Sequence, residues 1–263
     1  MQKFGIDISR WQGDFDLSQA IREGVEFAIL KIGGGDDGIY ADKKFNDYYA
    51  SSKALNLPVG CYFFGQAMTK EQAIKEAEAW ITLMKGKKFE YPVFYDVEAK
   101  MLQLPANVLT DIILEVCGRV ERAGYWVGIY SSIDFFNYSM QDERLVNYSH
   151  WVASWGVNKP KLLKGGDTQL WQFGGETNKI RSNKICGQTV DQNYSYMDFP
   201  SLIKAAHLNG YNEEEITENP LTANDVIEYI IKWKTIFPAG LSSQVINMIV
   251  DTLLSDIAKD LGV

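Results

Sequence analysis

Hydrophobic and polar positions follow two different periods along residues 1–205. Eight short apolar runs have the length and composition of β-strands, at residues 4–9, 27–33, 59–65, 92–98, 127–132, 150–156, 168–174 and 189–195. Four longer segments repeat their apolar positions with a helical period, at residues 17–24, 42–56, 70–86 and 105–123. In the last of these, one stripe carries Val108, Ile112, Val116 and Val120. The pattern predicts strands that alternate with helices.

The order of these segments indicates a closed barrel. Alternating β and α units form parallel sheets through right-handed crossovers, and eight such strands close naturally into a barrel. The segments that join the last three strands are short and rich in Gly, Asn and Lys, so they leave little room for crossover helices. We therefore predict an α/β fold, a modified TIM-like (β/α)5(β)3 barrel, over residues 1–208.

The C-terminal part reads as a separate small module. A short helix is expected after Pro200, and residues 209–220 have the Gly, Asn, Glu and Pro content of a linker. Two helices are predicted in residues 221–263, the second with an apolar stripe that runs from Ile246 to Leu261. Something must cover this stripe, because it is too apolar to stay in water.

Charge and composition exclude several classes of function. The formal net charge is −8 with no cluster of Lys or Arg, which argues against a nucleic-acid partner. We expect no membrane anchor, because no apolar stretch reaches the roughly 18 to 20 residues of a spanning helix. The strand segment FGIDIS begins at residue 4, with no charged leader and apolar run before it, so we expect synthesis in the cytoplasm without a signal peptide. The three cysteines, Cys61, Cys117 and Cys186, read as reduced and buried.

Two carboxylates end the fourth predicted strand. Asp96 and Glu98 are two residues apart, so strand periodicity puts them on the same face. In a parallel barrel the carboxyl ends of the strands open onto the active-site face, where two carboxylates can divide the acid and charge-stabilising roles of glycosidic cleavage. The alternative interpretation is that the pair begins a loop or binds Lys31 of a neighbouring strand.

Two further acids interrupt strands that are otherwise suited to burial. Asp7 lies in the first predicted strand and Asp191 in the last, and these strands are neighbours in a closed barrel. We therefore expect four acids in one cleft. Crowded carboxylates raise one another's pKa, so one member stays protonated near neutral pH. Glu98 is our predicted general acid.

Aromatic residues recur at the same strand ends. Because sugar-binding clefts use rings as stacking surfaces, we expect this set to contact a saccharide; a place in the ordinary core is the alternative for each ring alone. The predicted substrate-binding residues are Tyr62, Phe64, Tyr130, Trp155, Trp171, Gln172 and Trp11.

Other chemistries have weaker support. The chain has only two histidines, His150 and His207, so we expect no metal site and no cofactor, although an all-oxygen Mg²⁺ or Mn²⁺ site remains an alternative use of the acids. Residues 33–35 are Gly-Gly-Gly without the spacing of a phosphate-binding loop, and we interpret them as a turn. No Gly-x-Ser-x-Gly elbow is present.

With these residues in hand, the chain resembles glycoside hydrolase family 25, the Chalaropsis-type lysozymes, over about residues 1–205. The matching segments are GIDISRWQG at 5–13, FAILKIGGG at 27–35, LPVGCYFF at 57–64, FYDVE at 94–98, GIYSS at 128–132, WVASWG at 151–156, LWQFG at 170–174 and VDQN at 190–193. The resemblance implies that Glu98 is the proton donor and that Asp96 stabilises the intermediate. It also implies that Asp7 and Asp191 shape and charge the cleft, and that sugar subsites are lined by Tyr62, Tyr130 and Trp155.

The resemblance further implies cleavage of the β-1,4 bond between N-acetylmuramic acid and N-acetylglucosamine in bacterial peptidoglycan. Inversion, retention and participation of the 2-acetamido group remain open, and we prefer participation with Asp96 as the holding group. The rival functions are a non-catalytic glycan binder, a hydrolase of chitin-like polymers and a metal-dependent barrel enzyme; the DxxDxDxE motif of family 18 chitinases is missing.

Many phage lysins of this family carry an appended module, so we expect a phage or prophage endolysin that reaches the wall after holin-dependent release. Its C-terminal helices, within residues 221–263, would recognise the wall, associate into a homo-oligomer or pack on the barrel.

Overall fold

The computed structural model describes residues 2–35, 38–140, 142–163 and 166–211. The predicted helical module and most of the predicted linker fall within residues 212–263, outside the described residues. Eight strands form a closed barrel: β1 (Lys3–Ile8), β2 (Phe27–Gly34), β4 (Val59–Gly65), β5 (Val93–Val97), β6 (Val127–Ser132), β7 (Ser149–Ala153), β8 (Thr168–Gly174) and β11 (Asp191–Ser195).

The barrel closes through its first and last strands. Strand β1 pairs with β2 in parallel and with β11 in antiparallel orientation, and β11 is also antiparallel to β8. The prediction of eight parallel strands is therefore wrong for the last one. A connection without a crossover helix favours this reversal, because only parallel neighbours require a long crossover. The segment between β8 and β11 instead carries a small hairpin, β9 (Lys184–Ile185) with β10 (Gln188–Thr189).

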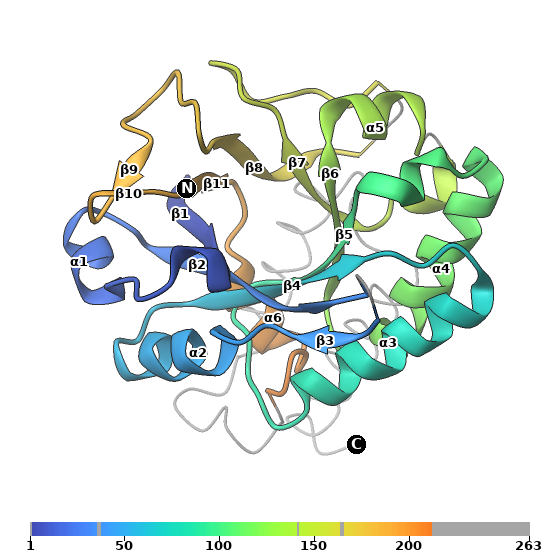
Figure 1. Cartoon of the computed structure of the whole chain (residues 1–263), viewed down its shortest axis with the longest axis horizontal. Helices are drawn as coiled ribbons and strands as arrows, with labels where there is room; N and C mark the ends of the chain where they lie inside the picture. The colour runs from blue at the N-terminus through green and yellow to red at the C-terminus, as the bar shows by residue number, and fades with distance from the viewer. Residues whose placement is uncertain (1, 36–37, 141, 164–165, 212–263) are drawn as a thin grey trace, which may run out of the picture.

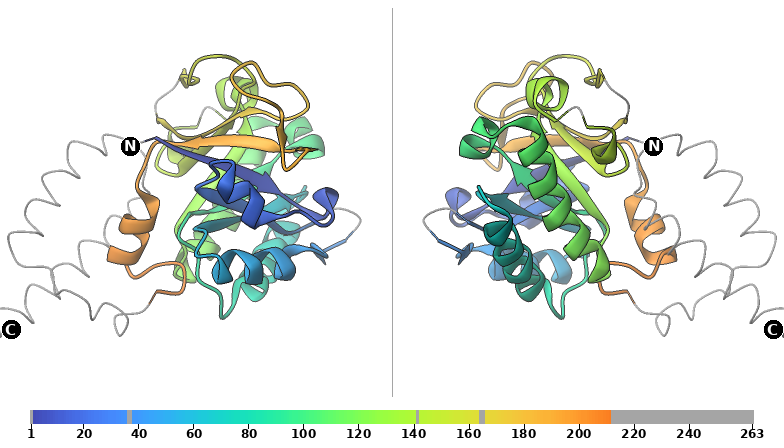
Figure 2. Two further views of the ribbon diagram at one scale, coloured as in Figure 1. Left: turned by 90° about the vertical axis from the view of Figure 1, so that its left-hand side faces the viewer. Right: turned by 90° about the vertical axis from the view of Figure 1, so that its right-hand side faces the viewer.

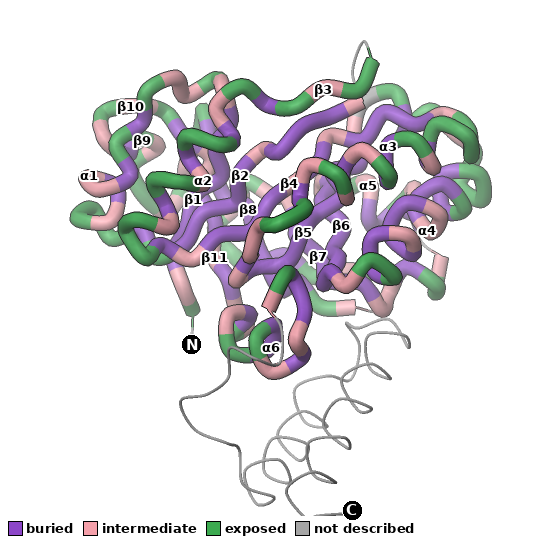
Figure 3. The backbone as a smooth tube through the Cα atoms, turned by 90° about the horizontal axis from the view of Figure 1, so that it is seen from below, coloured by how far each residue is buried: buried purple, intermediate pink, exposed green. Residues whose placement is uncertain are grey.

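The predicted (β/α)5(β)3 arrangement is confirmed. A helix follows each of the first five barrel strands, whereas the described residues between β7 and β8 and between β8 and β11 contain no α-helix. Figure 1 shows these helices along the β1 to β6 side of the barrel, and Figure 3 shows their exposed outer faces around buried strands. They are α1 (Leu17–Arg22), α2 (Phe45–Ala54), α3 (Lys70–Met84), α4 (Ala106–Arg122) and α5 (Ile133–Tyr138).

The buried stripe of α4 begins at Leu109, one residue later than the predicted Val108. Ile112 is 3% exposed and Val116 and Val120 are fully buried, but Val108 is 36% exposed. Leu109 takes the buried place in the first turn. The first turn of a helix has two candidate positions for one stripe, and packing against the sheet selects between them.

A sixth helix closes the barrel at the amino ends of the parallel strands. Helix α6 (Phe199–Ala205) lies at one end of the barrel, apart from the helices that flank its wall (Figure 2). Phe199 and Ile203 join a buried cluster with interior rings such as Phe27 and Trp126. Because this end is filled by side chains, the opposite end is the open mouth.

The first described residues of the predicted linker are part of the barrel base. The Asn209 side chain accepts a hydrogen bond from the backbone N–H of Trp126 at 2.7 Å and donates to the carbonyls of Phe89 and Tyr91 at 3.2 and 2.9 Å. Asn209 is fully buried. These bonds tie residue 209 to two separate barrel segments.

Glycines in two strands make room for large rings inside the barrel. A Cβ atom at Gly5 would lie 2.5 Å from the ring of Phe27, and one at Gly128 would lie 2.4 Å from the ring of Phe94. Both distances are too short for any side chain. The lower interior is therefore a packed aromatic core, and the polar residues are confined to the mouth.

Two smaller predictions are corrected. Gly33 and Gly34 are not a turn but the end of β2, where they pair with a short added strand, β3 (Tyr40–Ala41). Their lack of side chains permits this pairing, since a Cβ atom at Gly33 would lie 2.3 Å from the Tyr40 carbonyl oxygen. Cys61 and Cys117 are free and buried as predicted, but Cys186 is partly exposed. Within the described residues, none of the helices has the length and apolar character to cross a membrane.

Candidate active site

A cavity of about 160 Å³ lies at the carboxyl ends of the parallel strands. All four predicted acids line it. Asp7 lies in β1, Asp96 in β5 and Asp191 in β11, and Glu98 directly follows β5. The other residues of its wall are aromatic or polar. The complete lining is Asp7, Lys31, Tyr62, Phe64, Asp96, Glu98, Tyr130, Trp151, Gln172 and Asp191.

The reversed direction of β11 explains the position of Asp191. Asp7 lies near the carboxyl end of β1, whereas Asp191 is the first residue of β11. In an antiparallel pair the start of one strand lies beside the end of the other. The register pairs Asp7 directly with Asp191. A parallel last strand would have carried its first residue to the closed end of the barrel.

Asp7 is held by two amide side chains. Gln172 Nε2 and Asn193 Nδ2 both donate to Asp7 Oδ2, at 3.0 and 2.8 Å. Asn193 is oriented in turn by Trp151, whose Nε1 donates to Asn193 Oδ1 at 2.7 Å. Burial raises the pKa of Asp7 to about 6, and the two amides oppose this rise. Asp7 is thus fixed in place by two amide donors that favour its ionised form.

Asp96 lacks a partner for one of its oxygens. Its side chain is 5% exposed, and Oδ1 is buried without a hydrogen bond to any described residue. Burial, followed by the charge of Glu98, raises the pKa of Asp96 well above its usual range. Such an oxygen is an acceptor that a bound ligand can satisfy, and a costly one to leave empty.

Glu98 lies just beyond β5 at the start of a 3₁₀ turn, η2 (Ala99–Gln103). Burial, and after it the negative charge of Asp7, raises the pKa of Glu98. Burial also raises the pKa of Asp191 to about 8, with Asp7 and Glu98 adding to the rise. The cavity therefore holds a mixture of protonated and ionised carboxyl groups near neutral pH, which is the condition for acid and base roles at one site.

Lys31 is the cation of the cavity. Its ammonium lies 4.5 Å from the ring centroid of Phe64 and 5.6 Å from that of Tyr62. It forms no ion pair within 4.0 Å with a carboxylate of the described residues, so the alternative that it simply pairs with Asp96 or Glu98 does not hold. Its positive charge nevertheless lowers the pKa of both acids.

The predicted sugar-contacting residues divide between the wall and the rim. Tyr62, Phe64, Tyr130 and Gln172 line the cavity, and the Tyr130 hydroxyl donates to Gln172 Oε1 at 3.0 Å. Two tryptophans are exposed at the rim: Trp155 at 39%, with its Nε1 3.5 Å from Gln172 Oε1, and Trp11 at 76%.

Trp171 does not belong to this set. It is 3% exposed, stacks edge-on against Phe173 and donates its Nε1 to the Ser154 carbonyl at 2.7 Å. Adjacent residues of a strand point to opposite faces, so Trp171 and Gln172 cannot both enter the cavity. The prediction for Trp171 is corrected: it packs in the layer outside the barrel.

Three residues of the site were not predicted as such. Lys31 was considered only as an ion-pair partner, and Trp151 and Asn193 were not singled out. A charged residue within the apolar run FAILKIG was the available signal for Lys31. Trp151 and Asn193 carry no local signal, because their importance depends on the hydrogen bond that joins β7 to β11.

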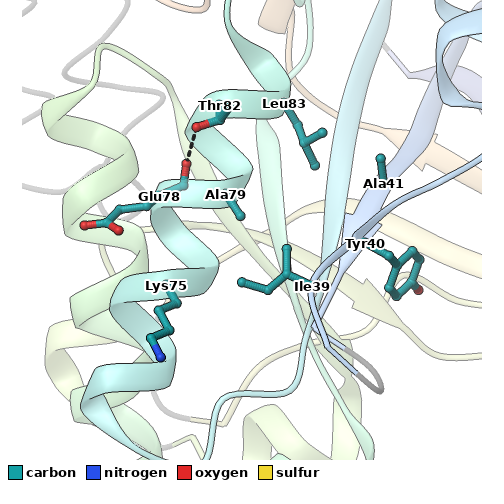
Figure 4. A pocket seen from close by; sticks show the side chains of 8 residues that line it. All are labelled: Ile39, Tyr40, Ala41, Lys75, Glu78, Ala79, Thr82 and Leu83. Carbon is teal, nitrogen blue, oxygen red and sulfur yellow. Dashed lines mark hydrogen bonds between the residues drawn. The ribbon is translucent and has the colours of Figure 1, made fainter.

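A second hollow, of about 450 Å³, lies outside the barrel between β3 and α3 (Figure 4). Its wall is largely apolar, with Lys75 and Glu78 as its charged residues. It therefore lacks paired carboxylates for hydrolytic chemistry. In the part of the chain that the structure describes, no three His, Cys, Asp or Glu side chains are grouped to hold a metal ion.

A closed barrel with four carboxyl groups among aromatic rings at its mouth has the architecture of a glycoside hydrolase. The chain belongs to glycosyl hydrolases family 25, whose model matches residues 6–181. The family predicted from sequence is thereby confirmed.

Relatives of known identity agree with this assignment. The chain is 25% identical to the autolytic lysozyme of Clostridium acetobutylicum over 60% of its length, and it spans only 47% of that relative. It is 25% identical to lysozyme M1 of Streptomyces globisporus over 71% of this chain and 68% of the relative. The crystal structure of the CTP1L endolysin superposes with a TM-score of 0.63 at 23% identity, over 78% of this chain and 70% of that one.

Proposed function

We propose that this protein is a peptidoglycan hydrolase that cleaves the β-1,4 bond between N-acetylmuramic acid and N-acetylglucosamine. The observation that carries the proposal is the convergence of Asp7, Asp96, Glu98 and Asp191 on one cavity in a family 25 barrel. The curated relatives are named as lysozymes, which supports peptidoglycan as the substrate.

Glu98 acts as the general acid in this proposal. Its raised pKa supports a protonated state in the resting cleft, from which it donates its proton to the glycosidic oxygen as the bond to C1 breaks. The resulting carboxylate then takes a proton from water as the water attacks C1. This proton restores the protonated state of Glu98 for the next cleavage.

Asp96 holds the 2-acetamido group of the sugar. Its unpaired buried Oδ1 is suited to accept a hydrogen bond from the acetamido N–H. Held in this way, the acetamido carbonyl oxygen attacks C1 as the leaving group departs, and water later opens the ring that forms. Two displacements at C1 retain the configuration of the sugar. Inversion of the product would refute this role.

Asp7 and Asp191 complete the charge of the cleft. Asp7, with a pKa of about 6, supplies a fixed negative charge that favours positive charge developing at C1. Asp191, with a pKa of about 8, carries a proton at neutral pH and can donate it in a hydrogen bond to a sugar oxygen. Tyr62, Tyr130 and Trp155 provide the surfaces against which sugar rings stack.

Host lysis by a phage or prophage endolysin is our proposed setting. The endolysin of known structure that shares this fold supports it. Residues 221–263 would then help to retain the enzyme on the wall or join two copies. A hydrolase of chitin-like polymers is the alternative with the same chemistry, since the roles proposed for Glu98 and Asp96 require only an acetamido sugar.

The decisive experiment is loss of turbidity of purified Gram-positive walls with the wild-type protein and Glu98→Gln, followed by mass spectrometry of the fragments. Glu143→Gln, an exposed change outside the cavity, is the matched control. We expect lysis with reducing N-acetylmuramic acid ends for wild type and control, and a loss of at least about 100-fold for Glu98→Gln. Cleavage of chitin but not walls would favour the alternative, and undiminished lysis by Glu98→Gln would refute the site.

A further inference from the structure

A strip of aromatic and cationic side chains leads from the cavity to the edge of the barrel mouth. The Arg10 guanidinium carbon lies 4.9 Å from the ring centroid of Trp11 and 5.3 Å from that of Tyr40. Tyr40 in turn lies 5.9 Å from the ammonium of Lys31, which lines the cavity. Arg10 is thus connected to the catalytic cleft through one ring.

Ile39 and Tyr40 are neighbours in the chain, and their side chains face different sides. Ile39, just before β3, points toward α3, and the ring of Tyr40 points away from that helix (Figure 4). Tyr40 thus lines the apolar hollow outside the barrel, while its ring contacts the cations on the other side.

The backbone that carries Arg10 is firmly held. The buried carboxylate of Asp42 accepts the Arg10 N–H at 3.1 Å, and Ser9 and Gln12 form a capping box around the 3₁₀ turn η1 (Arg10–Gln12). These bonds hold the backbone at Arg10 and Trp11 in one conformation, which sets the direction of their Cα–Cβ bonds. A binding group positioned in this way loses little conformational entropy when a ligand arrives.

Within the described part of the chain, the hydrogen bonds of Arg10 are all made by its backbone. Among the described residues, its guanidinium forms no salt bridge and donates no hydrogen bond; its backbone N–H donates to Asp42 and its carbonyl accepts from Gly13. This planar group, with its five N–H donors, lies within 5.3 Å of two ring centroids. A guanidinium in this state is suited to bind a carboxylate with two parallel hydrogen bonds.

The negative charge of the molecule bears on where an anionic ligand can bind. The chain has a formal net charge of −8, which disfavours anionic ligands over most of its surface. Neutral acetamido sugars need no cation. A carboxylate-bearing substrate is favoured where its charge meets a cation, and Arg10 provides one at the edge of the cleft.

We propose that Arg10, whose guanidinium lies over the rings of Trp11 and Tyr40, binds a carboxylate of the peptide attached to the lactyl group of N-acetylmuramic acid. This subsite rests on the proposed function and deepens it, because it lets the enzyme distinguish peptide-bearing peptidoglycan from bare acetamido-sugar strands. Cation–π attraction to the rings of Trp11 and Tyr40 favours this position of the guanidinium.

The test compares two substrates made from one preparation: teichoic-acid-free peptidoglycan, and the same peptidoglycan after a carbodiimide and ammonia have converted its peptide carboxylates into neutral amides. Arg10→Gln removes the charge, and Arg10→Lys keeps the charge but not the planar pair of donors. Arg22→Gln is the matched control, since Arg22 is an exposed arginine on α1 that bonds Ser18. Thermal unfolding checks that each variant is folded.

We expect Arg10→Gln to lower kcat/KM on the unmodified peptidoglycan by about tenfold, mainly through KM, and to leave kcat/KM on the amidated peptidoglycan within about twofold of wild type. The kcat/KM of Arg10→Lys on the unmodified peptidoglycan should lie between the values of wild type and Arg10→Gln. Equal loss on both substrates, or no loss on either, would overturn the proposal. If wild type cleaves neither substrate, the proposed function fails, and this failure is visible without any variant.

Discussion

Replacing Asp191 by asparagine should stabilise the folded protein in a pH-dependent manner. The pKa of Asp191 rises from 3.8 to about 8 on folding, first because of burial and then because of Asp7 and Glu98. The folded state therefore binds the Asp191 proton more tightly than the unfolded state does. Its carboxyl group costs nothing below about pH 4, and the cost grows as the pH rises toward 8. Asparagine has the same shape and no charge to desolvate.

The size of this effect follows from the same shift. One pKa unit corresponds to about 1.4 kcal/mol, so the free energy of unfolding at pH 7 could be lowered by at most about 4 kcal/mol through this one group. Protonation of one acid relieves its neighbours in the cavity, which reduces the net cost. We therefore expect Asp191→Asn to raise the free energy of unfolding by about 2 kcal/mol at pH 7 and by close to zero at pH 4.

Urea unfolding of wild type and variant at pH 4, 5.5 and 7 measures this difference, with the m value checked for constancy. Asp134→Asn, an exposed aspartate at the start of α5, is the control and should show no such trend. A difference between Asp191→Asn and wild type that is the same at all three pH values would refute the reasoning, because the effect would then not arise from a titrating group. A destabilised variant at pH 7 would refute its sign.

Two further predictions concern the support of the site and the C-terminal region. Trp151→Phe removes the donor to the buried Asn193 Oδ1 and shrinks a fully packed ring, so we expect a loss of about 2 kcal/mol in the free energy of unfolding, measured in urea, and a lower kcat/KM because Asn193 positions Asp7. Unchanged values for both would contradict the network. Deleting residues 212–263, just beyond the barrel contacts of Asn209, should lower co-sedimentation with walls while cleavage of soluble glycan fragments persists. A change of solution mass without a change in wall binding would instead assign the region to self-association.

The local periodicity of the chain determined most of the barrel. The eight strands and the helices after the first four were predicted within a few residues, because buried strands and amphipathic helices repeat their apolar positions at different intervals. The shared face of Asp96 and Glu98 follows from the same rule. The rule also excludes Trp171 from the cavity once Gln172 is placed there, so this correction was already present in the sequence.

Pairings between distant segments were decided only by the tertiary structure. The antiparallel direction of β11 depends on how a bare connection returns to the barrel, and that direction carries Asp191 to the mouth beside Asp7. The amide donors of Asp7 come from residues more than 160 positions away in the chain, with separations of 165 and 186. No local pattern can encode such contacts.

The chemistry of the two cations depends on the same long-range packing. In the sequence, Lys31 is a charge within an apolar strand and Arg10 is one residue of a loop. Strand β3 brings Tyr40 between them, because Gly33 and Gly34 let its backbone approach β2 closely. The sequence by itself determined which residues form strands and which share a face, since both depend on local spacing. The tertiary structure decided which charges meet which rings, because these contacts arise only when the barrel closes.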